Sequence, residues 1–288
     1  LCSDRVFCLC GRTPLPPTGG EGQARRTPGF VRYTGKGASA GAGVMVAGME
    51  PTRINAHLTL REYRGGIRYG TDALLLASFV RGGRRARCAD LGTGCGVIPL
   101  LLLASGRCGE ARGFEVQAEY AALAAENARD NGLDGRFAVV QGDIRSIGRL
   151  CPAGWADYVT ANPPYLRADC GGRNADFVKY AAFHEHFGDI DDFARAAAYL
   201  LGTGGVFYTV YRPDRLARLL TALSAAGLEP KRLRPVAADA GRAPSLVLVE
   251  SVRGAAEGMV YEKNLVLYRD PAHTQYTEEL ERIYHAFS

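Results

Sequence analysis

The sequence lacks any apolar run close to the ~20 residues that a helix needs to cross a bilayer. Its first ten residues hold too short an apolar stretch, interrupted by charges, for a signal peptide. These absences predict a soluble, cytoplasmic protein with no membrane partner. At 288 residues and 47% hydrophobic, the chain is long enough for one large domain or two modest ones.

The sequence also lacks a Cys-x-x-Cys pair, although it contains eight cysteines. Scattered cysteines in such a chain indicate reduced thiols and exclude a zinc ribbon or finger. His184, Glu185 and His186 lie together but have no third ligand at a recognisable spacing. We therefore expect no bound metal.

Positive charge is scarce outside the N-terminal segment. Residues 1–48 carry six basic and two acidic side chains, which is +4 of the net charge of +5. The remaining chain is nearly neutral, so its overall charge is weak evidence for a nucleic-acid surface. Residues 1–48 are also rich in Gly, Pro and Arg without periodicity, which predicts a disordered extension. Met45 and Met49 raise the alternative of a mis-called start, and a basic RNA-tethering tail is a third interpretation.

What is present is a short motif behind a predicted buried strand, residues 156–161. Asn162 is followed by Pro163, Pro164 and Tyr165. Two prolines have no N–H to give, so they end the strand and leave carbonyl groups without ladder partners. The Asn162 side-chain oxygen and the Pro163 carbonyl could then accept both hydrogens of a planar NH2 group, and Tyr165 could stack on the ring that carries it. A strand that ends in a proline turn with an exposed tyrosine is the alternative.

Asn-Pro-Pro-Tyr resembles the motif with which class I S-adenosylmethionine methyltransferases of the amino family hold an adenine or glutamine nitrogen. The resemblance implies catalytic roles for Asn162, Pro163 and Tyr165, and contact of Asn162 with the cofactor as well.

A second motif runs from Asp90 through Gly92, Gly94 and Gly96, between a predicted strand and a predicted helix. The spacing differs from the dinucleotide fingerprint Gly-x-Gly-x-x-Gly. An acid at the start of the loop would repel a pyrophosphate but suits a cationic sulfonium and ammonium. The loop therefore favours S-adenosylmethionine over NAD as the cofactor. A purely structural turn is the alternative.

Two further acids end predicted strands. Glu115 is placed to accept the ribose hydroxyls of the cofactor, and Asp143 to accept its adenine amino group. Exposed carboxylates at strand ends are the alternative for both. Asp90, Glu115, Asp143 and Asn162 should meet, because ligands bind at the carboxyl ends of strands in a doubly wound sheet.

Ahead of the glycine loop, residues 58–64 alternate as a strand, and Gly65-Gly66 suggests a hairpin turn. Thr71 or Asp72 could cap the apolar helix that follows. Arg68 to Asp72 could equally form a lip over the cofactor, with Thr71 in contact. This stretch resembles the Gly-Thr-Asp segment of bacterial tRNA adenine-N6 methyltransferases.

Basic side chains occur in two places in the second half of the chain. Arg167, Arg173 and Lys179 lie in a predicted loop and could contact RNA phosphates, or be solvated charges. Residues 231–234 (Lys-Arg-Leu-Arg) suggest either a charged edge strand or an RNA contact. Residues 245–250 should pair with them in a closing hairpin.

Over residues 57–288 the chain resembles the bacterial tRNA(Val) adenine-N6 methyltransferase family. The resemblance implies an α/β fold, a doubly wound, seven-stranded, mostly parallel Rossmann-like methyltransferase sheet with a closing antiparallel hairpin. Residues 49–288 would form one domain with a short N-terminal hairpin and helix lip. The implied enzyme is a monomer that methylates an adenine amino group near the anticodon of a valine tRNA.

Three alternatives stay open at this stage. One is an N5-glutamine methyltransferase of peptide release factors, although residues 1–48 are too Gly/Pro-rich to supply the helical substrate domain usual there. Another is a different RNA or DNA adenine-N6 methyltransferase. The third is a non-catalytic RNA-binding or cofactor-sensing protein, which would be expected to lack Asn162 or the glycines.

Overall fold

The computed structural model describes residues 49–55, 58–63, 70–163 and 188–287, with the backbone alone for residues 49–51. Its helices are α1 (Thr71–Phe79), α2 (Val97–Ala104), α3 (Ala118–Asp130), α4 (Ile147–Leu150), α6 (Ile190–Leu200), α7 (Leu216–Ala225) and α8 (Glu278–His285), with 3-10 turns η1 (Ile144–Ser146) and η2 (Pro213–Arg215). Its strands are β1 (Met49–Arg53), β2 (Thr59–Tyr63), β3 (Arg87–Leu91), β4 (Glu110–Glu115), β5 (Phe137–Gln141), β6 (Ala156–Ala161), β7 (Leu201–Tyr211), β8 (Leu228–Ala237), β9 (Leu246–Arg253), β10 (Val260–Tyr261) and β11 (Leu265–Val266).

The main sheet is doubly wound, as the sequence predicts. Its strand order is β10-β8-β9-β7-β6-β3-β4-β5, and β11 pairs with β8. Strands β3 to β7 are parallel, and β9 runs antiparallel to both β7 and β8. The seven expected strands and the closing hairpin are confirmed, and β10 and β11 add two short strands beside β8. The order reverses at β3, which makes that position the switch point of the sheet.

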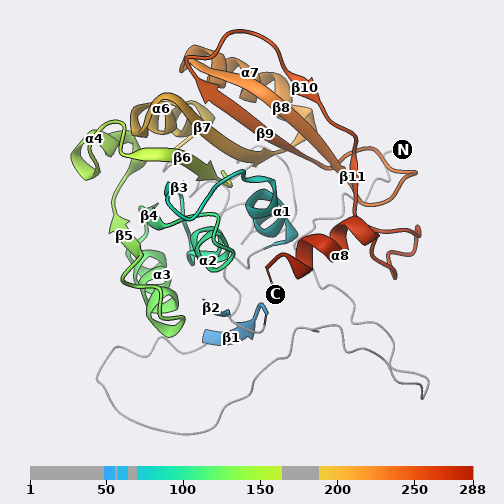
Figure 1. The fold of residues 1–288 in the computed structure, drawn as a ribbon, viewed down its shortest axis with the longest axis horizontal. Coiled ribbons are helices and arrows are strands. Elements are labelled where there is room, and N and C mark those ends of the chain that lie inside the picture. The colour runs from blue at the N-terminus through green and yellow to red at the C-terminus, as the bar shows by residue number, and fades with distance from the viewer. Residues whose placement is uncertain (1–48, 56–57, 64–69, 164–187, 288) are drawn as a thin grey trace, which may run out of the picture.

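Helices cover both faces of this sheet (Figure 1). One hydrophobic cluster joins α1, α2, α3 and α8 to one face, and a second joins α4, α6 and α7 to the other. Successive strand residues alternate between the faces, so Tyr158 belongs to the first cluster and Val159 to the second. Thr160 and Asn162 continue the series of Tyr158 and therefore fall on the α1 side.

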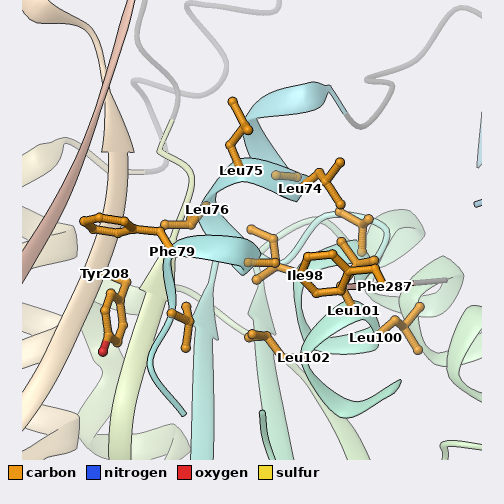
Figure 2. Packing of buried hydrophobic residues seen from close by; sticks show 14 of the residues in the cluster. Leu74, Leu75, Leu76, Phe79, Ile98, Leu100, Leu101, Leu102, Tyr208 and Phe287 are labelled. Carbon is orange, nitrogen blue, oxygen red and sulfur yellow. The ribbon is translucent and has the colours of Figure 1, made fainter. Parts of the chain in front are cut away.

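Helices α1 and α2 are apolar all round because both are buried. Residues 73–77 and 97–103 are each an unbroken buried run. Figure 2 shows leucines of the two helices in contact, with Phe79 of α1 directed toward Tyr208 of β7 and Phe287 packed near Ile98. The rings of Phe79 and Tyr208 meet edge to face with centroids 6.2 Å apart.

The C-terminal end of α1 is held by two arginines from other elements. Arg232 on β8 donates to the Phe79 carbonyl at 2.7 Å and lies over the Phe79 ring. Arg107 donates to the carbonyls of Ala77 and Ser78 at 2.8 and 2.7 Å. Cations at a helix C-terminus satisfy its last carbonyls and complement its dipole. Helix α1 is therefore fixed in place by chain segments that follow it.

The short β1–β2 hairpin docks on α3 through two asparagines one turn apart. Asn131 exchanges two hydrogen bonds with the Thr59 backbone, at 2.9 and 2.7 Å. Asn127 does the same with the Arg61 backbone, at 2.8 and 3.2 Å, and also donates to the Cys95 carbonyl at 2.8 Å. The two asparagine side chains thus form hydrogen bonds with the backbone of β2 on the edge that β1 does not pair with. Asn127 also connects the hairpin to the glycine loop.

Two local predictions are wrong, the cap of α1 and the edge strand at residues 231–234. Neither Thr71 nor Asp72 caps α1, because the N-cap is Gly70 and no side chain caps the helix. The predicted strand at residues 58–64 is confirmed over β2, which pairs with β1, a strand that the sequence did not suggest; the predicted turn at Gly65-Gly66 lies outside the described residues. Residues 231–234 are not an edge strand, because β10 and β11 pair with β8.

Arg232, in that same basic segment, is buried against Glu250 rather than presented to RNA. It donates to the carboxylate at 3.0 and 2.6 Å, and both side chains are almost fully enclosed. A buried charge is tolerated when it is paired and hydrogen-bonded in this way.

Candidate functional site

The predicted site residues gather at one edge of the sheet. Asp90 lies near the end of β3, Glu115 ends β4, Asp143 follows β5 and Asn162 follows β6. Asp90 is in register with Thr160 of β6, and Glu115 with Gln141 of β5. The carboxyl ends of four adjacent parallel strands therefore bring these side chains to the switch point, where ligands of doubly wound sheets bind.

Asp90 is buried and holds its neighbours together. Its two carboxylate oxygens accept hydrogen bonds from the hydroxyls of Thr160 and Thr93, each at 2.7 Å. Burial raises the pKa of Asp90 to about 7; the two hydroxyls lower it in part, and the charge of Glu115 adds to the rise. Only 1% of Asp90 is exposed, so it acts on the site through the shape and charge of the loop.

The glycine loop turns sharply and leaves space beside it. Gly94 has a φ of 56°, and a Cβ at this position would meet nothing within 4 Å. Gly96 has a φ of 84°, and a Cβ there would lie 2.8 Å from the Phe137 ring. Glycine at 96 is thus required by backbone and packing together, whereas glycine at 94 keeps open the surface that a ligand can approach.

Glu115 stands directly opposite this loop. Its Oε2 accepts the Gly94 N–H at 2.9 Å and its Oε1 accepts the Gln117 N–H at 3.1 Å. Burial raises the pKa of Glu115, and the backbone hydrogen bonds oppose that rise. Each carboxylate oxygen has two lone pairs, so the same group retains acceptor capacity for two hydroxyls of a ribose.

Asp143 lies at the rim and is engaged by Arg145. It caps η1 by accepting the Arg145 N–H at 2.8 Å, and it pairs with the guanidinium through both oxygens. The Arg145 side chain holds the pKa of Asp143 below its usual range. Asp143 can therefore remain an ionised acceptor for an amino group.

Asn162 is half-buried and Pro163 is buried at the end of β6. The Asn162 Nδ2 donates to Oδ2 of Asp72 at 3.0 Å. Thr71, beside it, forms a side-chain hydrogen bond with Tyr284 of α8. Of the predicted lip, Arg68 and Tyr69 lie outside the described residues, Asp72 meets the end of β6, and Thr71 contacts the C-terminal helix.

Several predicted residues lie outside the described part of the chain: Pro164, Tyr165, Arg167, Arg173, Lys179 and the segment His184 to His186. Among the residues that the structure describes, no three His, Cys, Asp or Glu side chains are grouped to hold a metal ion. None of the helices in the described ranges is long and apolar enough to span a membrane.

Sequence reasoning missed two residues that shape the site, Thr93 and Thr160, and one contact, that of Asp72 with Asn162. The contacts of the two hydroxyls with Asp90 could have been expected from the sequence. Thr160 is two positions before Asn162, on the same face of the strand, and Thr93 is three positions after Asp90. A contact between Asp72 and Asn162, 90 positions apart, left no local signal.

The residues present fit S-adenosylmethionine. The open surface at Gly94 admits a ligand, Glu115 offers acceptors for a ribose, and the buried acid Asp90 lies behind the loop, where a cationic group would favour its ionised form. No phosphate-binding cation is needed, in contrast to a nucleotide site.

Comparison with known proteins agrees with this chemistry. Residues 64–218 match the family model "Methyltransferase small domain". The tRNA1(Val) (adenine(37)-N6)-methyltransferase of Tolumonas auensis is 30% identical over 199 residues, covering 67% of this chain and 80% of that protein. A release factor glutamine methyltransferase of Agrobacterium fabrum is 43% identical over 86 residues, but these span only 29% of this chain and 28% of that protein.

A crystal structure from Agrobacterium tumefaciens, described as a predicted O-methyltransferase, has the same fold. It superimposes with a TM-score of 0.60 at 21% identity, covering 75% of this chain and 97% of that one.

Proposed function

The chain belongs to the methyltransferase small domain family and, within it, to the bacterial tRNA(Val) adenine-N6 methyltransferases; from this premise we propose that it methylates the exocyclic nitrogen of an adenine beside the anticodon of a valine tRNA. It is an S-adenosylmethionine-dependent methyltransferase. The name of the Tolumonas relative specifies adenine 37, and we carry that position over as part of the proposal.

The observation that supports the acceptor most directly is the placement of Asn162. It follows β6, next to the strand that carries the glycine loop, on the face where α1 lies. The amide oxygen of Asn162 and the carbonyl of Pro163 would each accept one hydrogen of the adenine amino group. The Tyr165 ring would stack on the base, which must be turned out of its loop to reach the site.

These contacts address the chemical difficulty of the reaction. The lone pair of an adenine amino group is delocalised into the ring, which makes the nitrogen a poor nucleophile. Two acceptors return electron density to that nitrogen and turn its lone pair out of the ring plane. Bound S-adenosylmethionine supplies an activated methyl group whose leaving group is a neutral thioether. Asn162 and Pro163 then contribute mainly by in-line placement.

The proton needs no dedicated base. The amino nitrogen becomes strongly acidic once it is alkylated, so an N–H already hydrogen-bonded to Asn162 or Pro163 can pass its proton to water. On the cofactor side, Gly94 and Glu115 would hold the donor, and Asp143 would accept its adenine amino group.

The test is incubation of the protein with labelled S-adenosylmethionine and total tRNA that lacks this modification, followed by nucleoside mass spectrometry. We expect label in N6-methyladenosine. A valine tRNA transcript in which adenine 37 is replaced by guanine should take up no label, and label retained there would contradict the position.

A glutamine side chain is also planar and also carries an NH2 group, so release factor is included as a second acceptor. Label in release factor but not in tRNA would overturn the proposal. It would favour the enzyme type matched over 86 residues.

A further inference from the structure

A side-chain hydrogen bond joins the first turn of α1 to the end of β6. The donor is Nδ2 of Asn162 and the acceptor is Oδ2 of Asp72, at 3.0 Å. We propose that Asp72 is a positioning residue, which fixes the orientation of the Asn162 amide for methyl transfer. The inference rests on the proposed function, because it assigns Asn162 the task of holding the acceptor amine.

The orientation matters because the two ends of an asparagine amide are opposite in function. Its oxygen only accepts and its NH2 group only donates, whereas an amine to be methylated presents N–H donors. An ionised carboxylate is also acceptor-only, so Asp72 pairs with the NH2 end of Asn162. The reversed amide would bring two oxygens together. Asp72 thus selects the rotamer in which Oδ1 faces away from it.

The charge of Asp72 also acts through the amide. A carboxylate that accepts from Nδ2 draws the N–H bond toward itself and increases the negative charge on Oδ1, since hydrogen bonds in a chain polarise one another. Oδ1 then becomes a stronger acceptor for the substrate amine. Neither effect requires contact between Asp72 and the substrate.

Asp72 is itself held firmly. Its Oδ1 accepts the Ala73 N–H at 3.0 Å, and a Cβ at Gly70 would collide with that oxygen. The adjacent Thr71 is tied to Tyr284, and α1 is buried from Ala73 to Ala77 and at Phe79. A group mounted on a buried, anchored helix can impose its geometry on a neighbour that follows the end of a strand.

The competing explanation is that Asp72 only stabilises α1, because an acid in the first turn favours the helix dipole. The chain offers a matched control. Asp191 is the second residue of α6, as Asp72 is of α1, and it pairs with Arg218 of α7, on the opposite face of the sheet from α1. A dipole effect should be similar in both helices, whereas an effect on Asn162 belongs to Asp72 alone.

The kinetic test compares Asp72→Ala, Asp72→Asn and Asp191→Ala with the wild type in methylation of unmodified tRNA. We expect Asp72→Ala to lower kcat about 10- to 100-fold, the range for a small misplacement of a reacting group. The calorimetric affinity for S-adenosylmethionine and the KM for tRNA should change little. Asp72→Asn should recover part of the rate, because its amide oxygen can still accept from Nδ2. Asp191→Ala should retain the wild-type kcat.

A second measurement does not depend on turnover. In deuterated, 15N-labelled protein, the side-chain amide signal of Asn162, identified by its loss in Asn162→Ser, should shift and exchange faster with solvent in Asp72→Ala but not in Asp191→Ala. An unchanged signal, or a wild-type kcat for Asp72→Ala, would overturn the inference. If the wild type methylates no tRNA while the signal still shifts, the proposed function fails and the positioning role stands.

Discussion

The two halves of the site are built differently. In the cofactor half, Asp90, Thr93, Gly94 and Glu115 come from 26 consecutive residues, and hydrogen bonds join Thr93 to Asp90 and Gly94 to Glu115. In the acceptor half, Asn162 is paired with a residue 90 positions earlier, on a helix whose other end is held by Arg232. A local loop can form the first half, whereas the second requires the packing of the whole fold.

Thr160 marks the border between the halves. It is two residues before Asn162 on the same face of β6, yet its hydroxyl donates to Asp90. One strand therefore serves both halves with successive side chains. Substitutions on this strand should separate cofactor binding from methyl transfer.

The largest expected effect concerns the buried acid of the cofactor half. The pKa of Asp90 is about 7 in the folded chain, against 3.8 for an ordinary aspartate. The folded state therefore keeps its proton between about pH 4 and pH 7, where the unfolded chain has lost it, so stability falls as pH rises through this window. The loss amounts to about 4 kcal/mol.

Asp90→Asn should remove this dependence, because an amide at this position does not titrate. The measurement is the free energy of unfolding in urea at a series of pH values. Exposed Asp134 in the turn after α3 provides the control, since Asp134→Asn should keep the wild-type slope. Parallel curves for the wild type and Asp90→Asn would show that the acid is not buried as described.

Asn162→Ala should abolish an acceptor for the amine while leaving the cofactor half intact. We expect kcat to fall about 10²- to 10³-fold, as for the loss of one transition-state hydrogen bond. Affinity for S-adenosylmethionine, measured by calorimetry, should change less than about twofold. Equal losses of both would make Asn162 structural.

Thr160→Val is the matched control on the same strand. It removes a hydroxyl from Asp90 and should weaken cofactor binding with a smaller effect on kcat. A large loss of kcat with normal cofactor affinity would show that Thr160 does not belong to the cofactor half.

The smallest expected effect is that of Glu115→Ala on cofactor affinity. Loss of charge-assisted hydrogen bonds to a ribose should cost about 1.5 to 3 kcal/mol, or about 10- to 100-fold in Kd. Glu110, exposed at the other end of β4, is the control, and Glu110→Ala should bind normally. The check is calorimetric titration; similar affinities for the two variants would remove Glu115 from the cofactor site.

The cofactor half could be predicted because its signals are short-range. Strand, glycine loop and helix follow each other directly, and the acids at strand ends stand at positions that the strand pattern itself locates. The doubly wound sheet followed from the same alternation of strands and helices.

Other features lacked such signals. Gly70 is the N-cap of α1 in place of the expected Thr or Asp, and Asp72 accepts from Ala73 and Asn162 instead. Strands β10 and β11 are two residues each, too short for any periodicity, so the sequence pattern predicts an edge at residues 231–234. The pairing of Asp72 with Asn162 arises only when α1 packs against the sheet.

The anchoring of α1 by Arg232 has a consequence for how the enzyme matures during synthesis. The ribosome releases the glycine loop and Glu115 early, and their mutual contacts close small loops at low entropic cost. Residue 232 emerges more than 150 positions after Phe79, and only then can the helix that carries Asp72 be locked. A nascent chain can thus shape much of its donor pocket before its acceptor pocket, and the helix that carries Asp72 is locked only after Arg232 has emerged.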